Sequence, residues 1–163
     1  MSSMSSTTVS HTPGKTRRFP LWLGIVGVIV ILGIVAFAVM TLRMNYVPDN
    51  LDTSTTLMSE NGHYQVSYTP KLSPVPVNQI QTWTVRVTDP NGQPVEDARI
   101  TVDGGMPQHG HGLPTVPQVT KYLGDGQYQV EGMKFHMPGW WVVKFKIVRN
   151  DLTDNVTFNL MLN

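Results

Sequence analysis

The chain has 163 residues, of which 40% are apolar and 14% charged, and its formal net charge at pH 7 is +1. This length suits one domain of ordinary size with an additional segment. Cysteine is absent, which excludes disulfides, thiolate metal ligands and a cysteine nucleophile. Residues 44–163 hold eight Lys and Arg against eleven Asp and Glu, so this part is mildly acidic and no nucleic-acid partner is expected.

One uncharged apolar stretch lies near the N-terminus. It runs for 22 residues from Leu21 to Leu42. A helix of that length measures about 33 Å, against a hydrocarbon core of about 30 Å. The sequence therefore predicts one transmembrane helix over residues 19–43.

Basic residues set the expected orientation of this helix. Lys15, Arg17 and Arg18 precede it, whereas Arg43 alone follows it. The positive-inside rule then places the N-terminus in the cytoplasm and the rest of the chain outside, as a single-pass protein of the cell membrane.

Two polar segments flank the helix. Residues 1–18 have no apolar periodicity and predict a disordered cytoplasmic tail. Residues 44–61 are also unpatterned and predict a tether. The alternative to an anchor is a cleaved signal peptide, because Ala36-Phe37-Ala38 has the small-x-small form of a cleavage site. The apolar run continues past Ala38, which favours the anchor.

From residue 62 onward the apolar pattern has a period of two, which is typical of half-buried strands. The residues predicted to point inward are Tyr64, Val66, Tyr68, Trp83, Val85, Val87, Ile100, Val102, Trp141, Val143, Phe145, Ile147, Val156, Phe158, Leu160 and Leu162. Turn signals separate the strands, among them Asp89-Pro-Asn-Gly92 and Gly124-Asp125-Gly126. About seven strands in residues 62–163 predict an all-β, immunoglobulin-like sandwich.

Two loop-like stretches of the predicted sandwich are rich in histidine and methionine. The first is Met106-Pro-Gln-His109-Gly-His111-Gly, and the second is Met133-Lys-Phe-His136-Met137. Glycine and proline around them predict loops, and sandwich folds gather distant loops at one end. We therefore expect the two stretches to meet.

Imidazole and thioether groups together suit copper better than magnesium or calcium. Copper is the predicted metal, with Cu(I) favoured and Cu(II) or zinc as competitors. The candidate ligands are Met106, His109, His111, Met133, His136 and Met137. Met133 and Met137 have an alternative use as core filler against Trp140 and Trp141, and His63 is expected to be structural.

No arrangement for hydrolysis is present in the sequence. There is no Gly-x-Ser-x-Gly, and no carboxylate near the His109/His111 pair would orient a base. The chain is therefore not expected to be an enzyme.

Four segments together resemble the YtkA-like domain and its FixH relatives. They are Asp89-Pro-Asn-Gly-Gln-Pro-Val95, the Met106 to Gly112 stretch, Gly126-x-Tyr128, and Phe135-x-Met137-Pro-Gly-x-Trp141. The resemblance covers about residues 62–162. It implies a bacterial extracytoplasmic protein of immunoglobulin-like fold, anchored to the membrane. FixH-type relatives imply a role in copper supply for the assembly of respiratory oxidases, with an oxidase subunit or a copper chaperone as partner.

A second function stays open. An immunoglobulin-like sandwich on a tether is also a common interaction module, in which Trp140 and its neighbours would contact a membrane partner without metal.

Overall fold

A computed structural model describes residues 20–163. The predicted tail and the basic residues Lys15, Arg17 and Arg18 lie outside these residues. The chain divides into two compact units between Thr41 and Leu42, and each is described by itself.

The first unit contains most of the only helix in the described part of the chain, α1 (Leu21–Asn45). Its segment Gly24–Leu42 is long and apolar enough to cross a membrane. Apolar side chains along it, such as Ile29, Leu32 and Phe37, are more than half exposed, so the helix needs an apolar environment from outside the chain. A membrane anchor and a signal sequence both fit this element.

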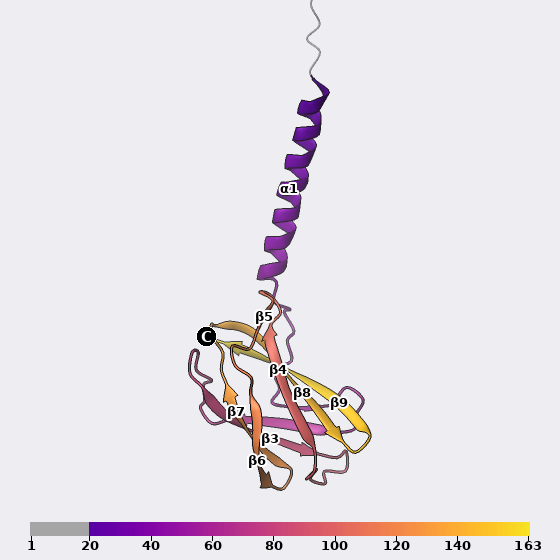
Figure 1. Cartoon of the computed structure of the whole chain (residues 1–163), viewed down its shortest axis with the longest axis vertical. Helices are drawn as coiled ribbons and strands as arrows, with labels where there is room; N and C mark the ends of the chain where they lie inside the picture. The colour runs from indigo at the N-terminus through magenta and orange to yellow at the C-terminus, as the bar shows by residue number, and fades with distance from the viewer. Residues whose placement is uncertain (1–19) are drawn as a thin grey trace, which may run out of the picture. The chain divides into compact units, whose positions relative to one another are not determined.

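The second unit is built from two antiparallel sheets (Figure 1). The five-stranded sheet has the order β1-β2-β3-β7-β6, and the four-stranded sheet has the order β5-β4-β8-β9. The strands are β1 (Thr56–Met58), β2 (Gln65–Pro70), β3 (Gln81–Thr88), β4 (Arg99–Met106), β5 (His111–Gly112), β6 (Gln118–Gly124), β7 (Gln127–Met133), β8 (Gly139–Arg149) and β9 (Leu152–Leu162). The predicted all-β sandwich is confirmed, with nine strands in the described residues where the sequence predicted seven.

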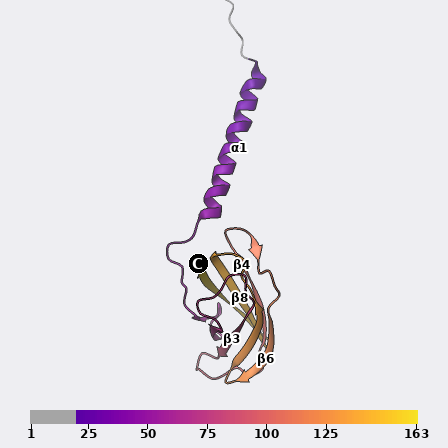
Figure 2. The same cartoon turned by 90° about the vertical axis from the view of Figure 1, so that its left-hand side faces the viewer.

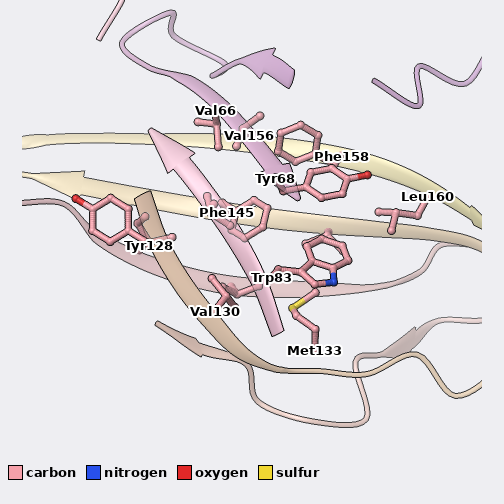
Figure 3. Close-up of a cluster of buried hydrophobic side chains, with 14 of the residues drawn as sticks. Val66, Tyr68, Trp83, Tyr128, Val130, Met133, Phe145, Val156, Phe158 and Leu160 are labelled. Carbon is pink, nitrogen blue, oxygen red and sulfur yellow. The ribbon is translucent and has the colours of Figure 1, made fainter. Parts of the chain in front are cut away.

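The core lies between the two sheets, and every side chain predicted to point inward is buried. Figure 3 shows residues of both sheets meeting in this core. Tyr68 stacks on Trp83 within one sheet, with ring centroids 4.6 Å apart, and meets Phe158 of the other sheet edge-on at 4.9 Å. Aromatic contacts of this kind add to the apolar area that holds the sheets together.

The first of the two extra strands lies in the segment predicted as a tether. Thr56 to Met58 pair with Gln65 to Ser67 of β2. Beyond this strand, the N–H of Glu60 donates to the carbonyl of Asn155, at 2.8 Å. The sheet therefore begins several residues before the expected start at residue 62. A strand of three residues is too short to show an alternating pattern, which is why the sequence did not predict it.

One end of the sandwich collects several chain segments. It contains β5, the connection from β7 to β8, and the C-terminal residues of β9, because Gly139 at the start of β8 pairs with Leu162. Two perpendicular views place the C-terminus and β5 at this same end (Figures 1 and 2). The histidine-rich stretches lie here.

Candidate metal site

A tight hairpin between β4 and β5 carries the first stretch. Met106 pairs with His111, and the N–H groups of His109 and Gly110 both donate to the carbonyl of Met106, at 3.2 and 3.0 Å. Gly110 has a positive φ of 64°, which glycine adopts without a steric cost. His109 lies on the turn, as predicted, whereas His111 belongs to a short strand.

Close packing of backbone holds this hairpin together. A Cβ atom at Gly105 would collide with the carbonyl oxygen of His111, and one at Gly104 would lie 2.5 Å from the carbonyl oxygen of Val142. Both positions thus require glycine. Gly105 lets β5 pack closely on β4, and Gly104 lets β4 pack closely on β8. This close packing fixes the position of His111.

The second stretch approaches from the connection between β7 and β8. The His136 ring lies 5.7 Å from the His111 ring, centroid to centroid, and 5.2 Å from the Trp141 ring. His109 lies 6.2 Å from His111. The expected meeting of the two stretches is therefore observed, and His111 is the middle ring of the three.

These separations suit imidazoles that share an ion. A nitrogen about 2.0–2.1 Å from the ion places the ring centroid roughly 3.2 Å from the ion. The centroids of two such rings are then about 5.2 Å apart when the ion is tetrahedral, and about 6.4 Å apart when the rings lie on opposite sides of the ion. The observed 5.7 and 6.2 Å fall between these limits. In the described residues, however, no three His, Cys, Asp or Glu side chains form a group that could hold an ion as they stand. The ligand atoms would have to move closer together to hold one.

One imidazole nitrogen in this group lacks a partner. Nδ1 of His136 is buried and makes no hydrogen bond among the described residues. A buried polar atom without a partner costs about 1–3 kcal/mol. Nδ1 of His136 is therefore open to an interaction that the described residues do not make as they stand.

The three candidate methionines occupy different environments. Met106 is 2% exposed, and its Cε atom lies 3.0 Å from the position of a Cβ at Gly139, so its thioether reaches the start of β8. Met137 is half-buried against the core, and its carbonyl accepts a hydrogen bond from Nε1 of Trp141 at 3.0 Å. Met106 pairs with His111 in the β4–β5 hairpin, and Met137 directly follows His136.

Met133 is fully buried. Figure 3 shows its side chain beside the indole ring of Trp83, inside the core. This placement favours the packing role over the ligand role, because thioethers fill gaps against aromatic rings.

Two buried polar groups at this end were missed by the sequence reasoning. Gln81 is 5% exposed, and neither its amide oxygen nor its amide nitrogen has a partner among the described residues; Nε1 of Trp83 is unpartnered as well. The burial of Gln81 could have been predicted from the sequence, since the alternation that turns Trp83 inward also turns Gln81 inward.

His63 lies in a second polar cluster, around Asp154. The Asp154 side chain is fully buried, and its Oδ2 atom lies 3.2 Å from Nδ1 of His63. The same carboxylate accepts hydrogen bonds from Oγ of Ser59 at 2.6 Å and from the N–H groups of Asn61, His63 and Asn155. Burial alone raises the pKa of Asp154, but the hydrogen bonds from Ser59 and the three N–H groups outweigh it and lower that pKa to about 2.

The family model described as YtkA-like matches residues 68–146. The matched region runs from the end of β2 into β8 and includes all three histidines of the group. No curated protein matches the chain.

Two solved structures are similar to the chain. A DUF4426 family protein from Pseudomonas aeruginosa is 16% identical, covers 66% of this chain and 94% of its own, and gives a TM-score of 0.49. The ZirS C-terminal domain is also 16% identical, covers 71% of this chain and 82% of its own, and gives a TM-score of 0.37.

Proposed function

Because this chain contains a YtkA-like domain over residues 68–146, we propose that it is a membrane-anchored extracytoplasmic protein that binds copper through its histidine group. In this proposal α1 is the anchor, the domain lies outside the cytoplasm, and copper is cargo handled for the assembly of a respiratory oxidase. The oxidase role rests on the resemblance to FixH-type proteins.

The observation that carries the proposal is the approach of His111 to His136. His111 lies in β5 and His136 in the connection between β7 and β8, 25 positions further along the sequence, yet their ring centroids lie 5.7 Å apart. His109 extends the group, and Met106, which pairs with His111, and Met137, which follows His136, would supply thioethers. Such a mixed donor set accepts Cu(I) or Cu(II), whereas zinc has little use for thioether.

Exposure of the histidines suits a carrier better than a structural site. His109 and His111 are exposed, and His136 is half-buried. An ion held there remains accessible from one side, so a partner could take it by ligand exchange. Closed structural sites surround their ion with protein ligands instead.

A competitive titration tests the proposal. The full chain in detergent is titrated with Cu(I), Cu(II) and Zn(II) against chelators, beside a His111→Ala/His136→Ala variant. We expect one tightly bound Cu(I) per chain, lost in the variant. His63→Ala is the matched control, because it removes an imidazole at a separate place and should leave the copper affinity unchanged. Equal binding by the double variant would contradict the proposal.

The interaction module remains the second candidate, and one observation favours it. Trp140 is half-buried on the outer face of β8, directly opposite Met161 of β9, which is 47% exposed. The ring is fixed by a 3.0 Å hydrogen bond from its Nε1 to Oδ1 of Asn159. Trp140 and Met161 thus form a partly exposed apolar surface that a partner could cover.

A pull-down of membrane partners separates the two candidates. Loss of the partner in Trp140→Ala, with retention in His111→Ala/His136→Ala, would favour the metal-free module. A partner that is captured only when copper is present and the histidines are intact would favour the copper carrier.

A further inference from the structure

Several buried polar atoms without a hydrogen-bond partner among the described residues gather at the end of the core next to the histidines. Gln81, Trp83 and His136 all carry buried polar atoms without a hydrogen bond among the described residues. Native cores leave only a few such atoms, and each one calls for an explanation.

Gln81 is connected to the His136 segment through the backbone. It pairs directly with Met133 in the ladder between β3 and β7. Close by, the N–H of Asn78 donates to the carbonyl of Phe135, at 2.7 Å. The start of β3 therefore runs alongside the chain that leads to His136.

The aromatic rings at this end link the same residues across the core. Trp83 lies 5.9 Å from Phe135, Phe135 lies 5.2 Å from Trp141, and the His136 ring meets Trp141 edge-on at 5.2 Å. Gln81 is two positions before Trp83 on the inward side of β3. Gln81 and His136 are therefore both connected to this aromatic group, Gln81 along β3 to Trp83 and His136 by its ring contact with Trp141.

The unpartnered atoms have complementary chemistry. A histidine that binds a metal through one nitrogen carries a proton on the other and almost always donates it to a protein acceptor or a water. Because Nδ1 of His136 is the buried nitrogen, Nε2 is left for an ion shared with His111. The N–H at Nδ1 then needs an acceptor inside the core, and the amide oxygen of Gln81 is a buried acceptor without a donor.

We propose that Gln81 is the positioning residue for His136: when the ion binds, the amide oxygen accepts the Nδ1 proton and holds the ring with Nε2 toward the ion. The inference rests on the proposed metal site. An amide oxygen has two lone pairs, so it can also accept from Nε1 of Trp83.

Gln81→Met tests this, because methionine keeps the length of the side chain and removes the amide. In the metal-free protein the melting temperature should rise, since two buried unpartnered atoms disappear. The affinity for Cu(I) should fall about ten- to a hundredfold, as for other partners of metal-bound histidines. Gln65→Met, on the exposed face of β2, is the matched control and should change neither quantity.

A purely structural Gln81 gives a different result. If the amide serves only Trp83 or the packing of the core, Gln81→Met will change the melting temperature but leave Cu(I) affinity equal to wild type, and the inference is overturned while the proposed function stands. If the wild-type chain binds no Cu(I), both are overturned.

A second measurement does not depend on how the variant folds. In wild-type protein labelled with ¹⁵N at histidine and loaded with Cu(I), NMR should show His136 bound through Nε2, with a slowly exchanging proton on Nδ1. A Cu(I)-bound Nδ1, or an Nδ1 proton that exchanges freely with water, overturns the inference.

Discussion

Single polar residues at inward positions decide much of what is specific to this domain. Alternation identified the apolar core correctly, but the same alternation also places the polar residues Gln81 and Asp154 inward, and the sequence analysis assigned them no place in the core. In each strand the buried apolar members begin two positions later, at Trp83 and at Val156. A pattern search that starts at the first apolar residue misses them, and their partners depend on contacts that no local pattern encodes.

Asp154 gives a prediction about pH. Its pKa is lowered to about 2 in the folded protein from an ordinary value of 3.8. The stability it contributes is therefore present above pH 3.8 and is lost as the pH falls toward 2. The contribution is on the order of 2 kcal/mol. Asp154→Asn should lower the free energy of unfolding at pH 7 and flatten its decline in acid. Denaturant unfolding at pH 7, 4 and 3 measures this. A variant as stable as wild type at pH 7 would show that the cluster with Ser59 and Asn61 does not hold the domain.

Leucine substitutions separate the ligand role of methionine from its packing role. Leucine has nearly the same volume, so each exchange costs less than about 1.5 kcal/mol in stability. Met106→Leu and Met137→Leu should weaken Cu(I) binding while leaving Zn(II) binding unchanged, because only copper uses the thioether. Met133→Leu, in the core beside Trp83, is the internal control and should bind both metals as wild type does. If only Met133→Leu weakened Cu(I) binding, Met133 would be the ligand, and Met106 and Met137 would have packing roles.

At the scale of elements, the sequence predicted the long strands well and the short ones poorly. Turn chemistry and alternation located the hairpin at Gly124-Asp125-Gly126 and the inward faces of β8 and β9. The strands β1 and β5 span three and two residues, which is below the length at which a period of two is visible. The strand β5 is important for the site, because its pairing with β4 holds His111 beside His136.

The β4 and β5 hairpin can be tested through its glycines. Gly105→Ala places a Cβ against the carbonyl oxygen of His111, so β5 must move away from β4. We expect a loss of about 1–3 kcal/mol in stability and weaker Cu(I) binding, because His111 leaves its place beside His136. Gly112→Ala is the matched control: its Cβ would meet nothing closer than 3.8 Å. The role assigned to the hairpin is wrong if both variants bind Cu(I) equally well.

At the scale of the whole molecule, one uncharged apolar run and the period of two after residue 62 were sufficient to predict an apolar helix followed by an all-β domain. Whether the helix stays attached is a matter of processing, and the orientation depends on basic residues outside the described part of the chain. Neither follows from the fold.

Protease treatment of intact spheroplasts tests the topology. We expect digestion of the domain from outside, with residues 44–163 lost from the membrane fraction and the helix retained, because Lys15, Arg17 and Arg18 favour a cytoplasmic N-terminus. Lysed spheroplasts serve as the control for protease access. A domain protected in intact spheroplasts would reverse the orientation, and a free domain beginning near Val39 would show a cleaved signal sequence.

The most direct test of the central claim is a crystal structure of the Cu(I)-loaded protein, with anomalous diffraction collected on both sides of the copper edge. The account predicts one copper peak at the end of the sandwich, bound by His111 and Nε2 of His136, with His109 or a thioether of Met106 or Met137 completing the coordination. A peak at His63 and Asp154, or no peak at stoichiometric copper, would contradict it.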